Sequence, residues 1–147
     1  MKVSMKPVTK EFALSGDSSG DSKVIIKQVT AGDERKLAAM NEDTTQVWDP
    51  HSKKLTGIKQ KWNPENLKRE RIWVTMISAD IEDEEKPGAC LFPSKQGQNG
   101  LERAFSREQF NTYYDALPSP LWEEIYGYVV DVNPHWSTLD EGDDEGE

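Results

Sequence analysis

The residues best suited to catalysis in this sequence are one cysteine and two histidines, Cys90, His51 and His135. A thiol or histidine mechanism needs a nucleophile, a base and an orienting group close together. The two histidines are far apart in the sequence, and each follows a proline in a turn-like setting. No local pattern joins either of them to Cys90. We therefore expect no catalytic residue and a protein that is not an enzyme.

An acidic cluster at Asp80 and residues 82–85 is the nearest approach to a metal site. A calcium-binding EF-hand loop needs ligands at alternating positions, a central glycine and a glutamate at position 12. Counted from Asp80, that position holds Leu91, so the spacing fails. One cysteine and two histidines cannot build a zinc site. The Gly-Gln-Asn-Gly at residues 97–100 lacks the lysine of a phosphate-binding loop. We expect no metal and no cofactor.

Basic residues surround Trp62, and charge of this kind can bind nucleic acid. They are Lys53, Lys54, Lys59, Lys61, Lys68, Arg69 and Arg71. The whole chain, however, carries a net charge of -9, and residues 137–147 hold acidic residues and no basic one. Because the acidic remainder would repel phosphate, nucleic-acid binding is disfavoured. We expect the basic face to meet an acidic protein surface, with Lys68, Arg69 and Arg71 in a partner-binding site.

Aromatic side chains near the C-terminus suggest a second part of that site. They are Trp122, Tyr126, Tyr128 and Trp136. In a helix from residue 119 to 132, Leu121, Ile125 and Val129 form an inward stripe, and Trp122 and Tyr126 form a second stripe beside it. Either one small domain covers both stripes, or the second stripe meets a partner protein or a second copy of the chain. We predict the four aromatic residues as partner-binding and keep burial as the alternative.

The elements that must position these residues indicate an α+β fold. The expected elements are a hairpin at 11–14 and 23–29, a helix at 33–42, a second hairpin or linker at 44–48 and 54–61, a central helix at 62–81, a loop at 82–103, and a C-terminal helical hairpin at 106–117 and 119–132. Ser106 and Gln109 form a capping box, and Ser119 and Asn63 suit N-cap positions.

We expect one domain at 11–136, a flexible arm at 1–10 and a disordered acidic tail at 137–147. No apolar run approaches the roughly 20 residues of a membrane span. A single cysteine favours a reducing compartment. The expected location is therefore the cytoplasm, with no membrane association.

Several segments of the chain match a known pattern. They are Gln28–Glu34 with Val-Thr-Ala-Gly-Asp at a helix start, Leu67–Ile77 with an arginine-rich start and an apolar end, Ile81–Phe92 with an acidic turn before Leu-Phe, Phe110–Pro120 with a Leu-Pro-Ser-Pro joint, and Val132–Trp136, which reads Val-Asn-Pro-His-Trp. Over about residues 24–136 the chain resembles the small tail assembly chaperones of long-tailed bacteriophages. The Ser-Gly-Asp loop at 15–22 and the loop at 97–100 look like insertions in that pattern.

The resemblance implies a non-enzymatic protein of the infected bacterial cytoplasm. Such a chaperone binds the long tape-measure protein and assists the assembly of tail-tube subunits around it. The resemblance supplies no catalytic residue. Two alternatives remain open, a structural component of the virion tail or neck, and an acidic inhibitor of a host enzyme.

Overall fold

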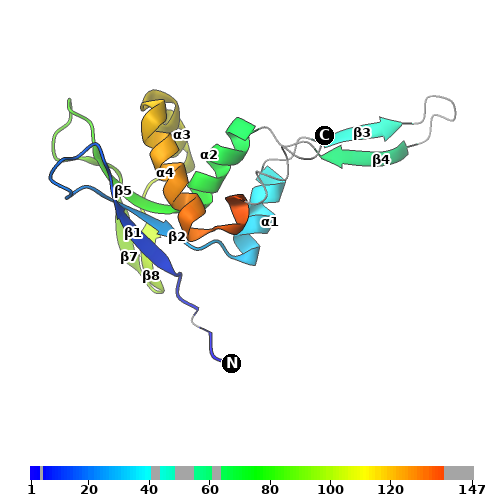
Figure 1. The fold of residues 1–147 in the computed structure, drawn as a ribbon, viewed down its shortest axis with the longest axis horizontal. Coiled ribbons are helices and arrows are strands. Elements are labelled where there is room, and N and C mark those ends of the chain that lie inside the picture. Colours follow the sequence, from blue (N-terminus) through cyan, green and yellow to red (C-terminus); the bar gives the residue numbers. More distant parts are fainter. Residues whose placement is uncertain (4, 41–43, 49–54, 61–63, 138–147) are drawn as a thin grey trace.

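The computed structural model describes residues 1–3, 5–40, 44–48, 55–60 and 64–137 (Figure 1). Its elements follow in the order β1 (Thr9–Ala13), β2 (Lys23–Lys27), α1 (Ala31–Met40), β3 (Thr44–Trp48), β4 (Leu55–Gln60), α2 (Pro64–Thr75), β5 (Met76–Glu82), β6 (Cys90–Phe92), β7 (Ser94–Gly97), β8 (Gly100–Arg103), α3 (Arg107–Ala116) and α4 (Ser119–Val132). The α+β class and the N-terminal hairpin are confirmed. The expected tail falls largely outside the described residues.

A four-stranded antiparallel sheet in the order β1-β2-β5-β6 forms the base of the body. Strand β2 is central, and its Val24 and Ile26 are completely buried. Its pairing with β5 contains a register shift between Ile25 and Ile26. The other two pairs of strands, β3-β4 and β7-β8, form separate two-stranded ribbons. Within the four-stranded sheet, the pairing of β2 with β5 joins chain segments that are about fifty residues apart.

The central helix is shorter than its sequence pattern indicated. It ends at Thr75, whose Oγ1 donates a hydrogen bond of 2.7 Å to the carbonyl of Arg71 one turn earlier. The chain then continues directly as β5, so the expectation of a helix through Ile81 is wrong. Residues 76–79 are buried between neighbouring strands and helices. A short, continuously buried segment of this kind has no alternation to distinguish a strand from a helix.

The expected loop at 82–103 also contains regular structure. β6 pairs with β5, and its Leu91 and Phe92 are buried. β7 and β8 form a hairpin whose turn ends at Gly100, and the positive φ of +109° there favours glycine. Leu91 and Phe92 therefore belong to the core, and the expectation of one long loop is wrong.

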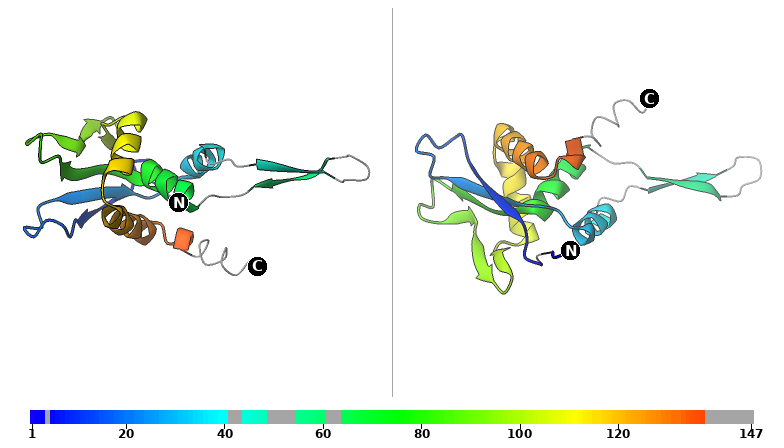
Figure 2. Two further views of the ribbon diagram at one scale, coloured as in Figure 1. Left: turned by 90° about the horizontal axis from the view of Figure 1, so that it is seen from above. Right: turned by 60° about the horizontal axis from the view of Figure 1, so that its bottom comes forward.

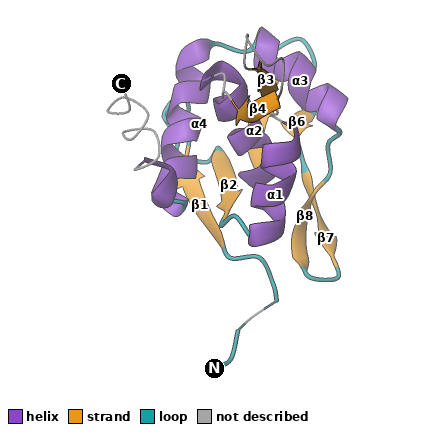
Figure 3. Cartoon of the chain, turned by 90° about the vertical axis from the view of Figure 1, so that its right-hand side faces the viewer, coloured by secondary structure: helices purple, strands orange, loops and turns teal. Residues whose placement is uncertain are grey.

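The C-terminal helices pack on α2. Ser106 is the N-cap of α3, as predicted, and its Oγ accepts from the Gln109 amide. The Gln109 side chain instead donates to the carbonyl of Leu91 at 2.8 Å, so the capping box is incomplete. Pro118, not Ser119, is the N-cap of α4. Figures 2 and 3 show α3 and α4 crossing at a steep angle rather than lying side by side along their length.

The core lies between the sheet and these helices and is rich in aromatic residues. Phe92 is at its centre, with ring centroids of Phe105, Phe110, Tyr113 and Trp122 between 5.2 and 6.3 Å away. Most of these pairs are edge-to-face, which aromatic quadrupoles favour. No helix in the described part of the chain is long and apolar enough to cross a membrane.

Candidate functional site

The sequence candidates for catalysis lie in separate places. The thiol of Cys90, on β6, donates to the carbonyl of Ala79 at 3.2 Å. His135, after α4, has its Nε2 3.1 Å from the Glu34 carboxylate. His51 lies outside the described residues. In the part of the chain that the structure describes, no group of three or more potential metal-ligating side chains is present.

Three of the predicted partner-binding residues are interior residues, so that part of the prediction is wrong. Trp122 and Trp136 are each 2% exposed, and Arg71 is 1% exposed. The alternative reading, burial within one small domain, holds for these two tryptophans. Sequence periodicity could not show this, because α4 packs against both β2 and α2.

The other four predicted residues are half-buried and already have partners in the chain. The Tyr126 hydroxyl accepts from Arg71 at 2.7 Å. Tyr128 stacks on Phe12, with ring centroids 4.4 Å apart. Lys68 pairs with Glu123 of α4. Arg69 pairs with the buried Glu70, which also accepts from Arg107 of α3. The contacts of Tyr126, Lys68 and Glu70 join α2 to α3 and α4, and the stacking of Tyr128 joins α4 to β1. They do not form one exposed binding surface.

The buried guanidinium of Arg71 connects α2 to the C-terminal segment. Besides its bond to Tyr126, it lies 4.7 Å from the centre of the Trp136 ring, within the range of a cation–π interaction. The indole Nε1 of Trp136 donates to Glu34 of α1 at 3.0 Å. Burial disfavours the charged Glu34 carboxylate, but its hydrogen bonds from His135 and Trp136 outweigh burial and lower its pKa. This network is structural rather than a binding site.

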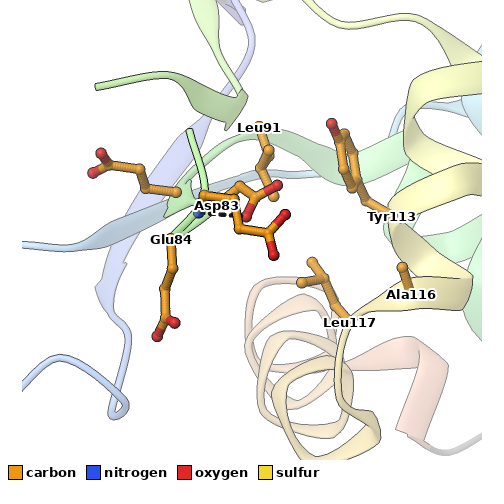
Figure 4. Close-up of a pocket in the computed structure, with 8 residues that line it drawn as sticks. Asp83, Glu84, Leu91, Tyr113, Ala116 and Leu117 are labelled. Atoms are coloured by element: carbon orange, nitrogen blue, oxygen red, sulfur yellow. Dashed lines mark hydrogen bonds between the residues drawn. The ribbon is translucent and has the colours of Figure 1, made fainter. Parts of the chain in front are cut away.

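A groove with two chemically different walls lies between the β5–β6 turn and the end of α3 (Figure 4). We call it the acidic groove. One wall is acidic and the other apolar, and the lining residues are Glu82, Asp83, Glu84, Glu85, Leu91, Tyr113, Ala116 and Leu117. Its volume is about 360 Å³.

Two carboxylates of the acidic groove accept hydrogen bonds from backbone amides of the same turn. Asp83 accepts from the Glu85 amide at 3.0 Å, and Glu82 accepts from the Gly88 amide. None of the four acids pairs with a lysine or arginine of the described residues. The groove thus offers an apolar surface beside uncompensated negative charge. Because residues 82–103 were read as a loop, the sequence did not reveal it.

Arg103 does not compensate these acids. A helix reaching Ile81 would have placed them at its C-terminus, where negative charge is unfavourable and needs a basic group to offset it. The end of α2 at Thr75 removes that conflict. The Arg103 guanidinium instead stacks on Trp73, 3.7 Å from the ring centre. Burial lowers the pKa of Arg103 to about 10.

The second candidate surface is the ribbon of β3 (Thr44–Trp48) and β4 (Leu55–Gln60), which we call the arm. Figure 1 shows the two strands projecting from the right-hand end of the body. The two strands pair antiparallel with each other and form a sheet separate from the other described strands. A lone two-stranded hairpin is marginally stable in water.

Comparison of this chain with family models, with curated proteins and with solved structures gave no match.

Proposed function

We propose that this chain is a non-enzymatic assembly factor, a tail assembly chaperone of a long-tailed bacteriophage that acts in the host cytoplasm. It binds the tape-measure protein and assists the assembly of tail-tube subunits. The observation that carries the proposal is the arm, because a separate two-stranded sheet is marginally stable alone and suits a protein that completes its fold on a partner. Open strand edges also accept further strands, which is a common way of binding extended chains.

The acidic groove supports the same proposal. Its apolar wall, formed by Leu91, Tyr113 and Leu117, can hold side chains of a partner, and its acidic wall selects for positive charge. Both features serve binding and need no bond to be made or broken.

The residues that carry the resemblance to the chaperones have contacts that maintain the fold. Asn133 is the C-cap of α4, and its Oδ1 accepts from the Val29 amide at 2.8 Å. Trp136 then folds back onto Arg71 and Glu34. The closing Val-Asn-Pro-x-Trp pattern therefore supports the proposal that this chain and the chaperones anchor their C-terminal segments in the same way. The functional part of the proposal depends on the arm and the groove.

Co-expression with the tape-measure protein of the same phage tests the proposal. We expect this chain to keep the tape-measure protein in solution and to co-purify with it. A variant in which a short Gly-Ser linker replaces residues 43–61 is expected to lose this effect while the body still folds. Lys10→Ala, which removes an exposed pair with Asp131 far from both surfaces, is the matched control. Equal rescue by the armless variant contradicts the proposed role of the arm.

A structural role in the virion is the second candidate, since an arm also suits a permanent assembly. Mass spectrometry of purified particles beside the infected-cell lysate separates the two. An assembly chaperone is abundant in the lysate and absent from particles. Recovery of this chain from particles in stoichiometric amount overturns the chaperone proposal and favours the structural one.

A further inference from the structure

Among the described residues, the exposed large apolar side chains lie in one stretch of chain, the residues before β1. Val3, Met5 and Val8 are 70%, 89% and 60% exposed, and Met1 is fully exposed. The carbonyl of Val8 accepts from the Gln28 amide at 2.8 Å, so the chain joins the sheet at Val8. We call residues 1–7 the N-terminal segment. Exposed apolar side chains gathered in one place indicate a contact with another surface.

The N-terminal segment alternates between apolar and basic side chains. Met1, Val3 and Met5 hold odd positions, and Lys2 and Lys6 hold even positions. All five are exposed, and the segment contains no acidic residue. Successive side chains of an extended chain point to opposite sides. When it is extended, the segment therefore has one apolar side and one basic side.

The acidic groove has two walls that match these two sides. Figure 4 shows Asp83 and Glu84 on one side of it, and Tyr113, Ala116 and Leu117 on the other. The acidic wall forms no ion pair with a lysine or arginine of the described residues. An extended segment between the walls places its apolar side chains against one wall and its lysines against the other. A single orientation of the N-terminal segment thus satisfies both walls.

The N-terminal segment and the groove lie at opposite ends of the same sheet. β1 and β5 each pair antiparallel with β2, so they run in the same direction. The segment precedes β1, whereas the groove lies beyond the end of β5. Figure 1 shows the N-terminus below the body and the green β5–β6 turn at its left-hand end.

The N-terminal segment is too short to fill the groove of its own chain. The 7 residues of β5 alone span about 23 Å. That is also roughly the full extended length of residues 1–7. A segment that turned back along the sheet would be used up before any of it lay between the walls. The groove that it fits is therefore that of a second copy.

We propose that the N-terminal segment of one copy of this chain lies extended in the acidic groove of a second copy. Lys2 and Lys6 face the carboxylates of the β5–β6 turn, and the three apolar side chains face the end of α3. The contact joins two different surfaces, so repetition gives a ring if the rotation closes and a filament if it does not. The inference goes beyond the proposed function, because it needs neither the arm nor another phage protein.

Charge-swapped variants of the purified full-length chain test this inference. The segment variant carries Lys2→Glu and Lys6→Glu, and the groove variant carries Glu84→Lys and Glu85→Lys. Light scattering after size exclusion at low salt measures the mass. We expect the wild-type mass to rise at least twofold above the 16.7 kDa monomer as concentration increases, and to return to it in about 1 M salt. Each variant alone is expected to remain monomeric.

Mixing the two variants restores both complementary contacts, because the reversed segment meets the reversed groove and the native segment meets the native groove. The mixture is therefore expected to regain the wild-type mass. A third variant, with Val3→Ser and Met5→Ser, keeps every charge and loses the apolar side, so it is expected to stay monomeric. Circular dichroism confirms that each variant is folded, and Lys95→Glu on the exposed part of β7 is the control for a charge change elsewhere.

Three results overturn the inference. The first is a wild-type chain that stays monomeric at every concentration. The second is a mixture of the two charge-swapped variants that stays monomeric although both are folded. The third is a segment variant that still assembles as the wild type does, since a different part of the chain then makes the contact between copies.

Discussion

The indole Nε1 of Trp136 donates a hydrogen bond of 3.0 Å to the carboxylate of Glu34, which lies 102 residues earlier in the chain. This bond fastens the segment after α4 to α1. The ring of Trp136 is meanwhile covered by the Arg71 guanidinium and is 2% exposed. The last described turn of the chain thus belongs to the core, although it follows the final helix.

Trp136 variants should separate the hydrogen bond from the packing. Trp136→Ala removes a fully buried ring and is expected to lower the free energy of unfolding by about 3–5 kcal/mol. Trp136→Phe keeps an aromatic surface for Arg71 and loses the Nε1 donor, so a loss of about 1–2 kcal/mol is expected from the bond and the smaller ring. Urea denaturation followed by circular dichroism measures both. Equal losses would show that the packing against Arg71 contributes little.

Glu34 should make stability depend on acid pH. Its hydrogen bonds hold the pKa of the carboxyl below the ordinary value of 4.5. A carboxyl whose folded pKa is depressed stabilises the fold above the ordinary pKa, and the stabilisation is lost as the pH falls through the folded pKa. The stability advantage of the wild type over Glu34→Gln is therefore expected to shrink below about pH 4.5. Urea midpoints between pH 7 and pH 3 measure it, and a constant difference contradicts the assignment.

The sequence predicted the elements whose signals are local. The hairpin of β1 and β2 follows from β-branched residues on either side of a Ser-Gly-Asp turn, and the start of α3 follows from Ser106, whose Oγ does accept from the Gln109 amide. The end of α2 at Thr75 could not be predicted in this way. It is set by the pairing of β5 with β2, a contact between segments about fifty residues apart.

The candidate site could be predicted only in part, because it too depends on contacts between segments that are distant in the sequence. Trp122 belongs to an aromatic stripe that sequence periodicity assigns to a surface or a core equally well. It is buried because Phe92, from a segment read as a loop, packs against it at 5.8 Å. The acidic wall of the groove was visible in the sequence, but its apolar wall comes from β6 and α3, which tertiary structure brings together.

Phe92 tests whether β6 is part of the core. It is completely buried and contacts four aromatic rings from three other segments. Phe92→Ala is expected to lower the free energy of unfolding by about 3–5 kcal/mol, because the surrounding rings cannot close the cavity. Lys95→Ala on the exposed β7 is the matched control, with an expected change within about 0.5 kcal/mol. A mild effect of Phe92→Ala would return residues 90–92 to a mobile loop.

Arg71 distinguishes a structural residue from a partner-binding one. Arg71→Ala is expected to lower the free energy of unfolding by about 3–5 kcal/mol, because it removes the hydrogen bond to Tyr126 and empties the space beside Trp136. Arg71→Met fills much of that volume without a charge, so it should cost less. Arg69→Ala is the half-exposed neighbour for comparison and should cost about 1 kcal/mol or less. Thermal and urea unfolding of the three variants measures these costs. A stable Arg71→Ala protein that fails to bind its partner would instead place Arg71 in an interface.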